Sequence, residues 1–110
     1  MDNVKNALTG ALKISEDVII TVARLAALDV KGVAGLSGEI GKMSKLKKNG
    51  PITVKMFEDV AALDIKIKVK SGVKTMQVAQ EVQSAVKESI QTMTGVAVAR
   101  VNVIVDGVVF

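Results

Sequence analysis

The stretch 75–109 constrains the fold most, because one spacing of apolar residues gives way there to another. Its first part repeats apolar side chains at three- and four-residue steps, with polar residues between them, which indicates an amphipathic helix. The repeating residues are Val78, Val82, Ala85, Val86, Ile90 and Met93. Gly95 follows the last turn, where a residue with positive φ can close a helix and let the chain reverse.

The second part of this stretch alternates, as a half-buried strand does. The residues expected to share one direction are Ala97, Ala99, Val101, Val103 and Val105. The residues expected on the other side are Arg100, Asn102 and Asp106, and Val98 and Ile104 are exceptions to the pattern. A helix followed at once by a strand predicts a helix laid on a sheet.

Composition limits the core and the chemistry. The chain has 110 residues, enough for one hydrophobic core and too few for two. Apolar residues make up 49% of it, yet only Phe57 and Phe110 are aromatic, and Cys, His, Trp and Tyr are absent. The core is therefore expected to be aliphatic, and the absence of Cys excludes disulfides and thiolate chemistry.

The hydropathy and charge of the chain indicate where in the cell the protein is found. No run of consecutive apolar residues exceeds four, whereas a membrane-spanning helix needs about 20. A signal peptide also needs a longer apolar run, so we expect a cytoplasmic protein. The formal net charge is +4, with lysine favoured over arginine, which suits a solvated basic surface better than a site that grips phosphate.

The chain is expected to form one domain. Residues 1–11 predict a loosely ordered start, and residues 12–110 a single domain. Ser15 is a good N-cap because its hydroxyl can accept a hydrogen bond from an amide of the first turn. A helix is therefore expected to begin at Glu16 and to end near Gly32. Its wide apolar surface predicts burial on more than one side.

Glycines and a hairpin complete the fold prediction. We assign structural roles to Gly32, Gly35, Gly38 and Gly95, because a phosphate loop would need a Lys-Ser/Thr pair after the glycines. The ranges 52–57 and 63–70 alternate on either side of a turn near Glu58 and Asp59, which predicts a β-hairpin. The whole pattern predicts an α+β fold, a two-layer sandwich with two helices packed on a mostly antiparallel sheet.

Candidate catalytic side chains are few. General acid–base catalysis near neutral pH most often uses His, and His, Cys and Tyr are all missing. The carboxylates of Glu58, Asp59 and Asp64 could bind a hard cation or form a catalytic pair, but a polar turn beside a strand is the favoured interpretation. We therefore expect no enzyme activity, no metal site, no cofactor and no small-molecule substrate.

Lysines supply the candidate interaction surface. Lys66, Lys68 and Lys70 share the outward face of one strand, and further lysines could extend it, namely Lys74, Lys42, Lys45, Lys47 and Lys48. Such a surface can meet nucleic acid or anionic lipid. Binders of single-stranded nucleic acid usually stack bases on aromatic rings, and on this face only Phe57 could supply such a ring. Lysines that solvate the sheet are the simpler interpretation.

Three stretches, in their order and spacing, resemble the alkaline shock protein family, the envelope stress response proteins of mainly Gram-positive bacteria. The first is a helix leading into GVAGLSG at 32–38, and the second is VAALDI at 60–65. The third runs from Val82 through MTG at 93–95 and VNV at 101–103 to Val108. The similarity covers about residues 12–108, nearly the whole domain.

The resemblance implies a non-enzymatic cytoplasmic protein that works at the membrane or cell envelope through a partner carrying the membrane anchor. Some relatives are linked to cell-wall homeostasis and others to fatty-acid synthesis. This chain departs from better-known members by being basic and by lacking a long charged tail. The family pattern supplies no catalytic residue to carry over.

The leading hypothesis is a protein–protein interaction module that forms a homo-oligomer. Self-association is expected because Val108, Val109 and Phe110 make an apolar chain end, which a monomer would bury or leave as an exposed patch. Two alternatives stay open. One is a nucleic-acid or anionic-lipid binding module that uses the basic strand face, and the other is a regulator of a lipid-synthesis enzyme.

Overall fold

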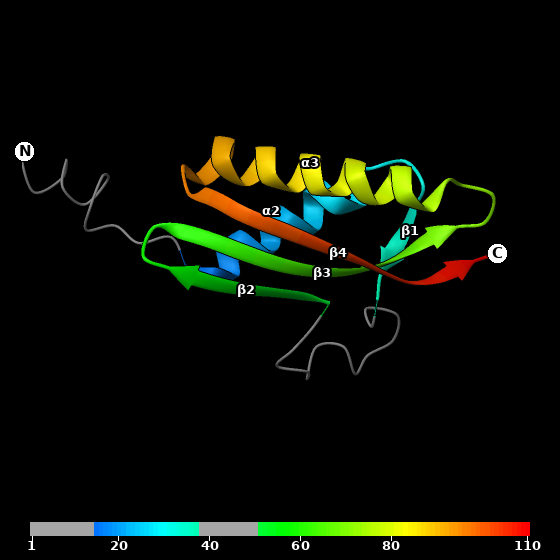
Figure 1. Cartoon of the computed structure of the whole chain (residues 1–110), viewed down its shortest axis with the longest axis horizontal. Helices are drawn as coiled ribbons and strands as arrows, with labels where there is room; N and C mark the ends of the chain where they lie inside the picture. The colour runs from blue at the N-terminus through cyan, green and yellow to red at the C-terminus, as the bar shows by residue number, and fades with distance from the viewer. Residues whose placement is uncertain (1–14, 38–50) are drawn as a thin grey trace, which may run out of the picture.

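The computed structural model describes residues 15–37 and 51–110, in which two helices pack on one face of a four-stranded sheet (Figure 1). The elements in chain order are α2 (Glu16–Leu28), β1 (Val33–Leu36), β2 (Ile52–Phe57), β3 (Val60–Lys70), α3 (Thr75–Thr94) and β4 (Ala97–Val109). The predicted α+β two-layer sandwich is confirmed. Several predicted features lie outside the described residues: the start at 1–11, Gly38, Lys42, Lys45, Lys47 and Lys48.

The central strand is β3. β2 pairs with its first half and β1 with its second half, both antiparallel, so these two short strands share one edge of β3. β4 runs parallel to β3 on the other edge, from the pair Val60 and Ala97 to the pair Lys70 and Val109. Two of the three strand pairings are antiparallel, as predicted. α3 is the crossover that a parallel pair requires.

The predicted hairpin forms between β2 and β3. Phe57 pairs with Val60, so only Glu58 and Asp59 lie in the turn. Glu58 has a φ of 56°, the positive value that two-residue hairpin turns need at their first central position. The register of the hairpin directs Ile52 and the other apolar alternating residues to the helix side.

α2 begins where predicted and ends earlier. Its first turn is capped by Ser15, whose side chain accepts a hydrogen bond from the Val18 amide at 3.2 Å. The helix ends at Leu28 with Asp29 as its C-cap, so the predicted end near Gly32 is wrong. The Asp29 amide still closes the last turn on a helical carbonyl, and the next residues turn the chain into β1.

Burial on α2 is confined to one side. Ile19, Ala23 and Ala27 are fully buried, whereas Val18 and Leu25 are 45% and 62% exposed. The expectation of burial on more than one side is therefore wrong. The buried side of α2 carries Ile19 and small alanines, which pack in the core shared with α3 and the sheet, whereas Val18 and Leu25 lie on the solvent side.

α3 follows the predicted period closely. Its buried residues are Val78, Val82, Val86 and Ile90. Met93, in the last turn, is 70% exposed although the pattern includes it. The helix ends at Gly95, which has a φ of 75° and donates its amide hydrogen to the Gln91 carbonyl oxygen at 3.1 Å.

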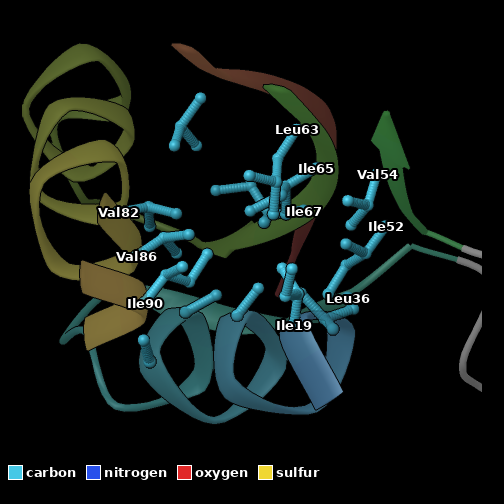
Figure 2. Packing of buried hydrophobic residues seen from close by; sticks show 14 of the residues in the cluster. Ile19, Leu36, Ile52, Val54, Leu63, Ile65, Ile67, Val82, Val86 and Ile90 are labelled. Atoms are coloured by element: carbon cyan, nitrogen blue, oxygen red, sulfur yellow. The ribbon is translucent and has the colours of Figure 1, made fainter. Parts of the chain in front are cut away.

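The core lies between the helix layer and the sheet (Figure 2). Every second residue of β3 points into it, and Ile65 and Ile67 are fully buried. Figure 2 shows side chains from α2, α3 and the strands meeting there: Ile19, Leu36, Ile52, Val54, Leu63, Val82, Val86 and Ile90. All of them are aliphatic, as the composition predicts.

β4 has two irregularities in its pairing with β3, one near its start at Ala99 and one at Asp106, between the pairs that Val105 and Gly107 make. Ala99 is an extra residue between the pairs that Val98 and Arg100 make with β3, which is a β-bulge. Val98 is buried and Ala97 and Ala99 are exposed, so the prediction that these two alanines share the direction of Val101 is wrong. Beyond the bulge, the residues on the helix side are Val101, Val103 and Val105, as predicted.

Candidate interaction surface

The face of the sheet opposite the helices carries the lysine row. Because the odd-numbered residues of β3 are buried in the core, Lys66, Lys68 and Lys70 project from the opposite face, which we call the open face. Lys66 and Lys70 are exposed, and Lys68 is half-buried. Lys74 is exposed as the N-cap of α3, which places it after the end of β3. The structure therefore joins three of the eight predicted lysines in one row.

Two further cations belong to the open face, and the sequence reasoning did not include them. Lys55 on β2 and Arg100 on β4 are both register partners of Ala62, one on each side of β3. All three residues therefore point from the same face of the sheet. The alternation within each strand indicated their direction, but only the pairing register shows that they flank β3.

Carboxylates interrupt this basic surface at two places. Asp64 pairs across the sheet with Thr53 on one side and Asn102 on the other. Asp106 on β4 accepts a hydrogen bond from the Ser37 hydroxyl. Cationic side chains still outnumber carboxylates on the open face, so it is a mixed surface with a basic excess.

Backbone contacts hold the Asp106 end of this face in place. The Ser37 amide donates to the Lys66 carbonyl oxygen at 2.9 Å, which fixes Ser37 beside β3. Gly107, next to Asp106, pairs with Lys68, and a Cβ at Gly107 would lie 3.0 Å from the Lys68 ammonium nitrogen. The Lys68 side chain therefore crosses over β4, where the absence of a side chain on Gly107 leaves room for it.

Exposed apolar residues add contact area to the open face. Phe57 at the end of β2 is 62% exposed, and Ile104 on β4 is 38% exposed. Phe57 is one ring at one corner of the described surface. Single-stranded nucleic acid is usually held by several stacked bases, so a lone ring is weak support for that ligand.

The hairpin carboxylates do not form a cluster. Glu58 and Asp59 lie at the tip of the hairpin, whereas Asp64 lies within β3. Within residues 15–37 and 51–110, no group of three or more acidic, His or Cys side chains is placed to hold a metal ion.

An open groove runs between the end of α2 and the outer side of α3. Its volume is about 680 Å³, and Gln, Glu and Ser side chains of α3 line much of it. Wide and polar, it differs from ligand pockets, which are concave and mostly apolar. We therefore place the candidate functional site on the open face.

The sequence matches a family model along nearly its whole length. The model is that of the alkaline shock protein family, described as having a cell envelope-related function, and it matches residues 4–110. The chain belongs to the alkaline shock protein family. The resemblance seen in the sequence is therefore confirmed, and both the core-forming β3 and its lysine row lie inside the family match.

A curated relative gives a more distant likeness. The chain is 26% identical over 106 residues to the uncharacterized protein YqhY of Bacillus subtilis (strain 168). The match covers 92% of this chain and 78% of that protein.

Solved structures share the fold. MamM-CTD H285A has a TM-score of 0.55 at 17% identity, and the match covers 84% of this chain and 98% of that one. The manganese form of MamM CTD E289D has a TM-score of 0.54 at 18% identity, covering 84% and 99%. At this level of identity the likeness concerns the fold alone. Neither α2 nor α3, the helices of the described part, is long and apolar enough to cross a membrane.

Proposed function

We propose that this protein is a non-enzymatic module of the cell envelope stress response that binds other proteins through the open face. The observation that carries the proposal is the match of residues 4–110 to a family with a cell envelope-related function. The basic row formed by Lys66, Lys68 and Lys70 supplies a surface for binding, and the chain has no His or Cys for common catalytic chemistry.

The chemistry of the open face favours a protein partner with an acidic surface. The open face carries cationic, acidic, amide, hydroxyl and apolar side chains next to one another. A protein surface can complement all five kinds of side chain. Carboxylates such as Asp64 would repel a phosphate backbone or an anionic lipid. Phe57 and Ile104 can be buried by apolar residues of a partner, as anchors of an interface commonly are.

The proposed place of action is the cytoplasmic side of the membrane. The partner is proposed to carry the membrane anchor and to recruit this chain to the envelope. A lipid-synthesis enzyme that uses the same surface would be a different partner for the same mechanism. The proposal also includes self-association, supported by the exposure of the apolar residues Val108, Val109 and Phe110.

Affinity capture from the native cells tests the partner. The bait is the tagged full chain, and the test variant is Lys66→Glu/Lys70→Glu. The matched control is Lys31→Glu/Lys87→Glu, which makes the same change of charge at exposed lysines away from the open face. We expect wild type and control to retain one membrane-anchored protein and the test variant to lose it. Equal retention by all three chains would contradict the proposed surface.

Nucleic acid and lipid binding are tested with the same variants, because the lysine row specifically favours an anionic ligand. The probes are a single-stranded RNA oligonucleotide and vesicles of phosphatidylglycerol or phosphatidylcholine. We expect only weak binding that falls steeply with salt, as sequence-independent electrostatic binding does. Binding to RNA or anionic vesicles that persists at about 150 mM salt and is lost in Lys66→Glu/Lys70→Glu would favour the alternative function.

A further inference from the structure

The outer edge of β4 is the longest strand edge without a partner in the part of the chain that the structure describes. β4 has 13 residues, and among the described residues it pairs only with β3. Proteins commonly protect such an edge with Pro, Lys or β-bulges; β4 contains no Pro or Lys, and its two bulges, at Ala99 and Asp106, leave residues 100–105 between them in regular register. An edge of this length and composition is a template for another strand.

The middle of β4 is complementary to itself. From Arg100 to Val105 its side chains alternate between the open face and the helix side in unbroken register with β3, and Asp106, the extra residue of a second β-bulge before Gly107, is exposed. In an antiparallel pair of two β4 strands centred on Val103, Arg100 lies directly opposite Asp106 of the partner subunit. The same pair of opposite charges forms a second time by symmetry.

The apolar residues match in the same arrangement. On the helix side, Val101 lies opposite Val105 of the partner subunit, and Val103 lies opposite its own copy. Val103 and Val105 are only partly buried in one chain, so pairing would remove more apolar surface from water. Cross-strand pairs of β-branched residues and of opposite charges both stabilise a sheet.

We propose that two copies of this chain join through their β4 edges, antiparallel and centred on Val103, to form one continuous sheet. This inference rests on the proposed self-association and specifies its interface. The interface is isologous, as two-fold dimers require. The two-fold axis is perpendicular to the sheet, so both helix layers lie on one side and both open faces form one larger basic surface on the other.

Other registers lose the charge pairing. Centred on Asn102, the pair would place Arg100 opposite Ile104 of the partner subunit. Centred on Ile104, it would place Arg100 opposite Val108 of the partner subunit. A parallel pair in register would set Arg100 beside its own copy and Asp106 beside its own copy, which is repulsive. The charges on β4 therefore select the register centred on Val103.

Charge exchange gives a direct test by sedimentation velocity across a series of protein concentrations. The chains are wild type, Arg100→Asp, Asp106→Arg and a one-to-one mixture of the two variants. Each variant alone sets like charges opposite each other at both sites, and the mixture restores two opposite-charge pairs. Lys87→Asp on the exposed side of α3 is the control, and circular dichroism checks that every chain is folded.

We expect wild type and Lys87→Asp to dimerise, each edge variant alone to raise the dimer Kd by on the order of tenfold, and the mixture to recover the wild-type Kd. Recovery in the mixture separates interface repulsion from the loss of the Ser37 hydrogen bond in Asp106→Arg. A wild-type monomer at all concentrations would overturn both self-association and this interface. A dimer Kd that is unchanged in both edge variants would overturn the β4 interface while self-association stands. The same holds if the mixture of the two variants dimerises no more tightly than each variant alone.

Discussion

Replacing Gly32 by alanine tests how closely the turn after α2 packs against α3. Gly32 is buried and has a φ of 96°, and a Cβ built on it lies 2.7 Å from Cγ2 of Val78. A left-handed conformation costs an L-residue about 1–2 kcal/mol. Overpacking costs about 1–3 kcal/mol more, so we expect Gly32→Ala to lower the free energy of unfolding by about 2–5 kcal/mol.

Alanine substitutions at two other glycines separate the cost of the left-handed backbone from the cost of overpacking. Gly72 has a φ of 88° with no atom within 4 Å of a built Cβ, so Gly72→Ala should cost only the backbone part, about 1–2 kcal/mol. Gly35 has neither a positive φ nor a close neighbour, so Gly35→Ala should change stability by less than about 1 kcal/mol. The difference between Gly32→Ala and Gly72→Ala estimates the cost of the contact with Val78.

The assay is urea unfolding followed by far-ultraviolet circular dichroism, at one protein concentration because self-association would link stability to concentration. Val78→Ala removes the methyl group that the new Cβ would meet, so Gly32→Ala should cost less in that background. Equal costs for Gly32→Ala and Gly72→Ala, with no coupling to Val78→Ala, would refute the close packing of this turn on α3.

Three further changes test single features by the same unfolding assay. Ser15→Ala removes the N-cap of α2 and should cost about 1 kcal/mol, and an unchanged midpoint would show that the cap hydrogen bond does not stabilise the helix. Glu58→Asn relieves a positive φ and should raise stability by about 0.5–1 kcal/mol, whereas a loss would contradict the turn geometry. Ile67→Ala empties a fully buried position of the central strand and should cost about 2–5 kcal/mol, and a cost below about 1 kcal/mol would place Ile67 outside the core.

Local patterns predicted the elements best. The start of α2 at Glu16, the apolar face of α3 and its end at Gly95 all follow from interactions within a few residues. The outward direction of Lys66 and Lys70 also followed from alternation alone, because one face of β3 is buried. Local signals of this kind need no knowledge of which strands pair.

Features that depend on distant contacts were not predictable in the same way. The bulge at Ala99 reverses the facing of Ala97, and it exists only in relation to β3. Leu25 fits the apolar surface expected for α2, yet it is exposed because the sheet covers only one side of the helix. Lys55 and Arg100 meet around Ala62 through two separate strand registers, which a single sequence does not encode locally.

Site-specific photo-crosslinking in the native cells tests the central claim, that the open face binds a partner protein, most directly. A photoreactive residue is placed at Lys66 on the open face, and in a second chain at Lys87 on the exposed side of α3. The account predicts one discrete protein adduct from position 66 and none from position 87. No adduct from position 66, the same adducts from both positions, or capture of nucleic acid in place of protein would contradict it.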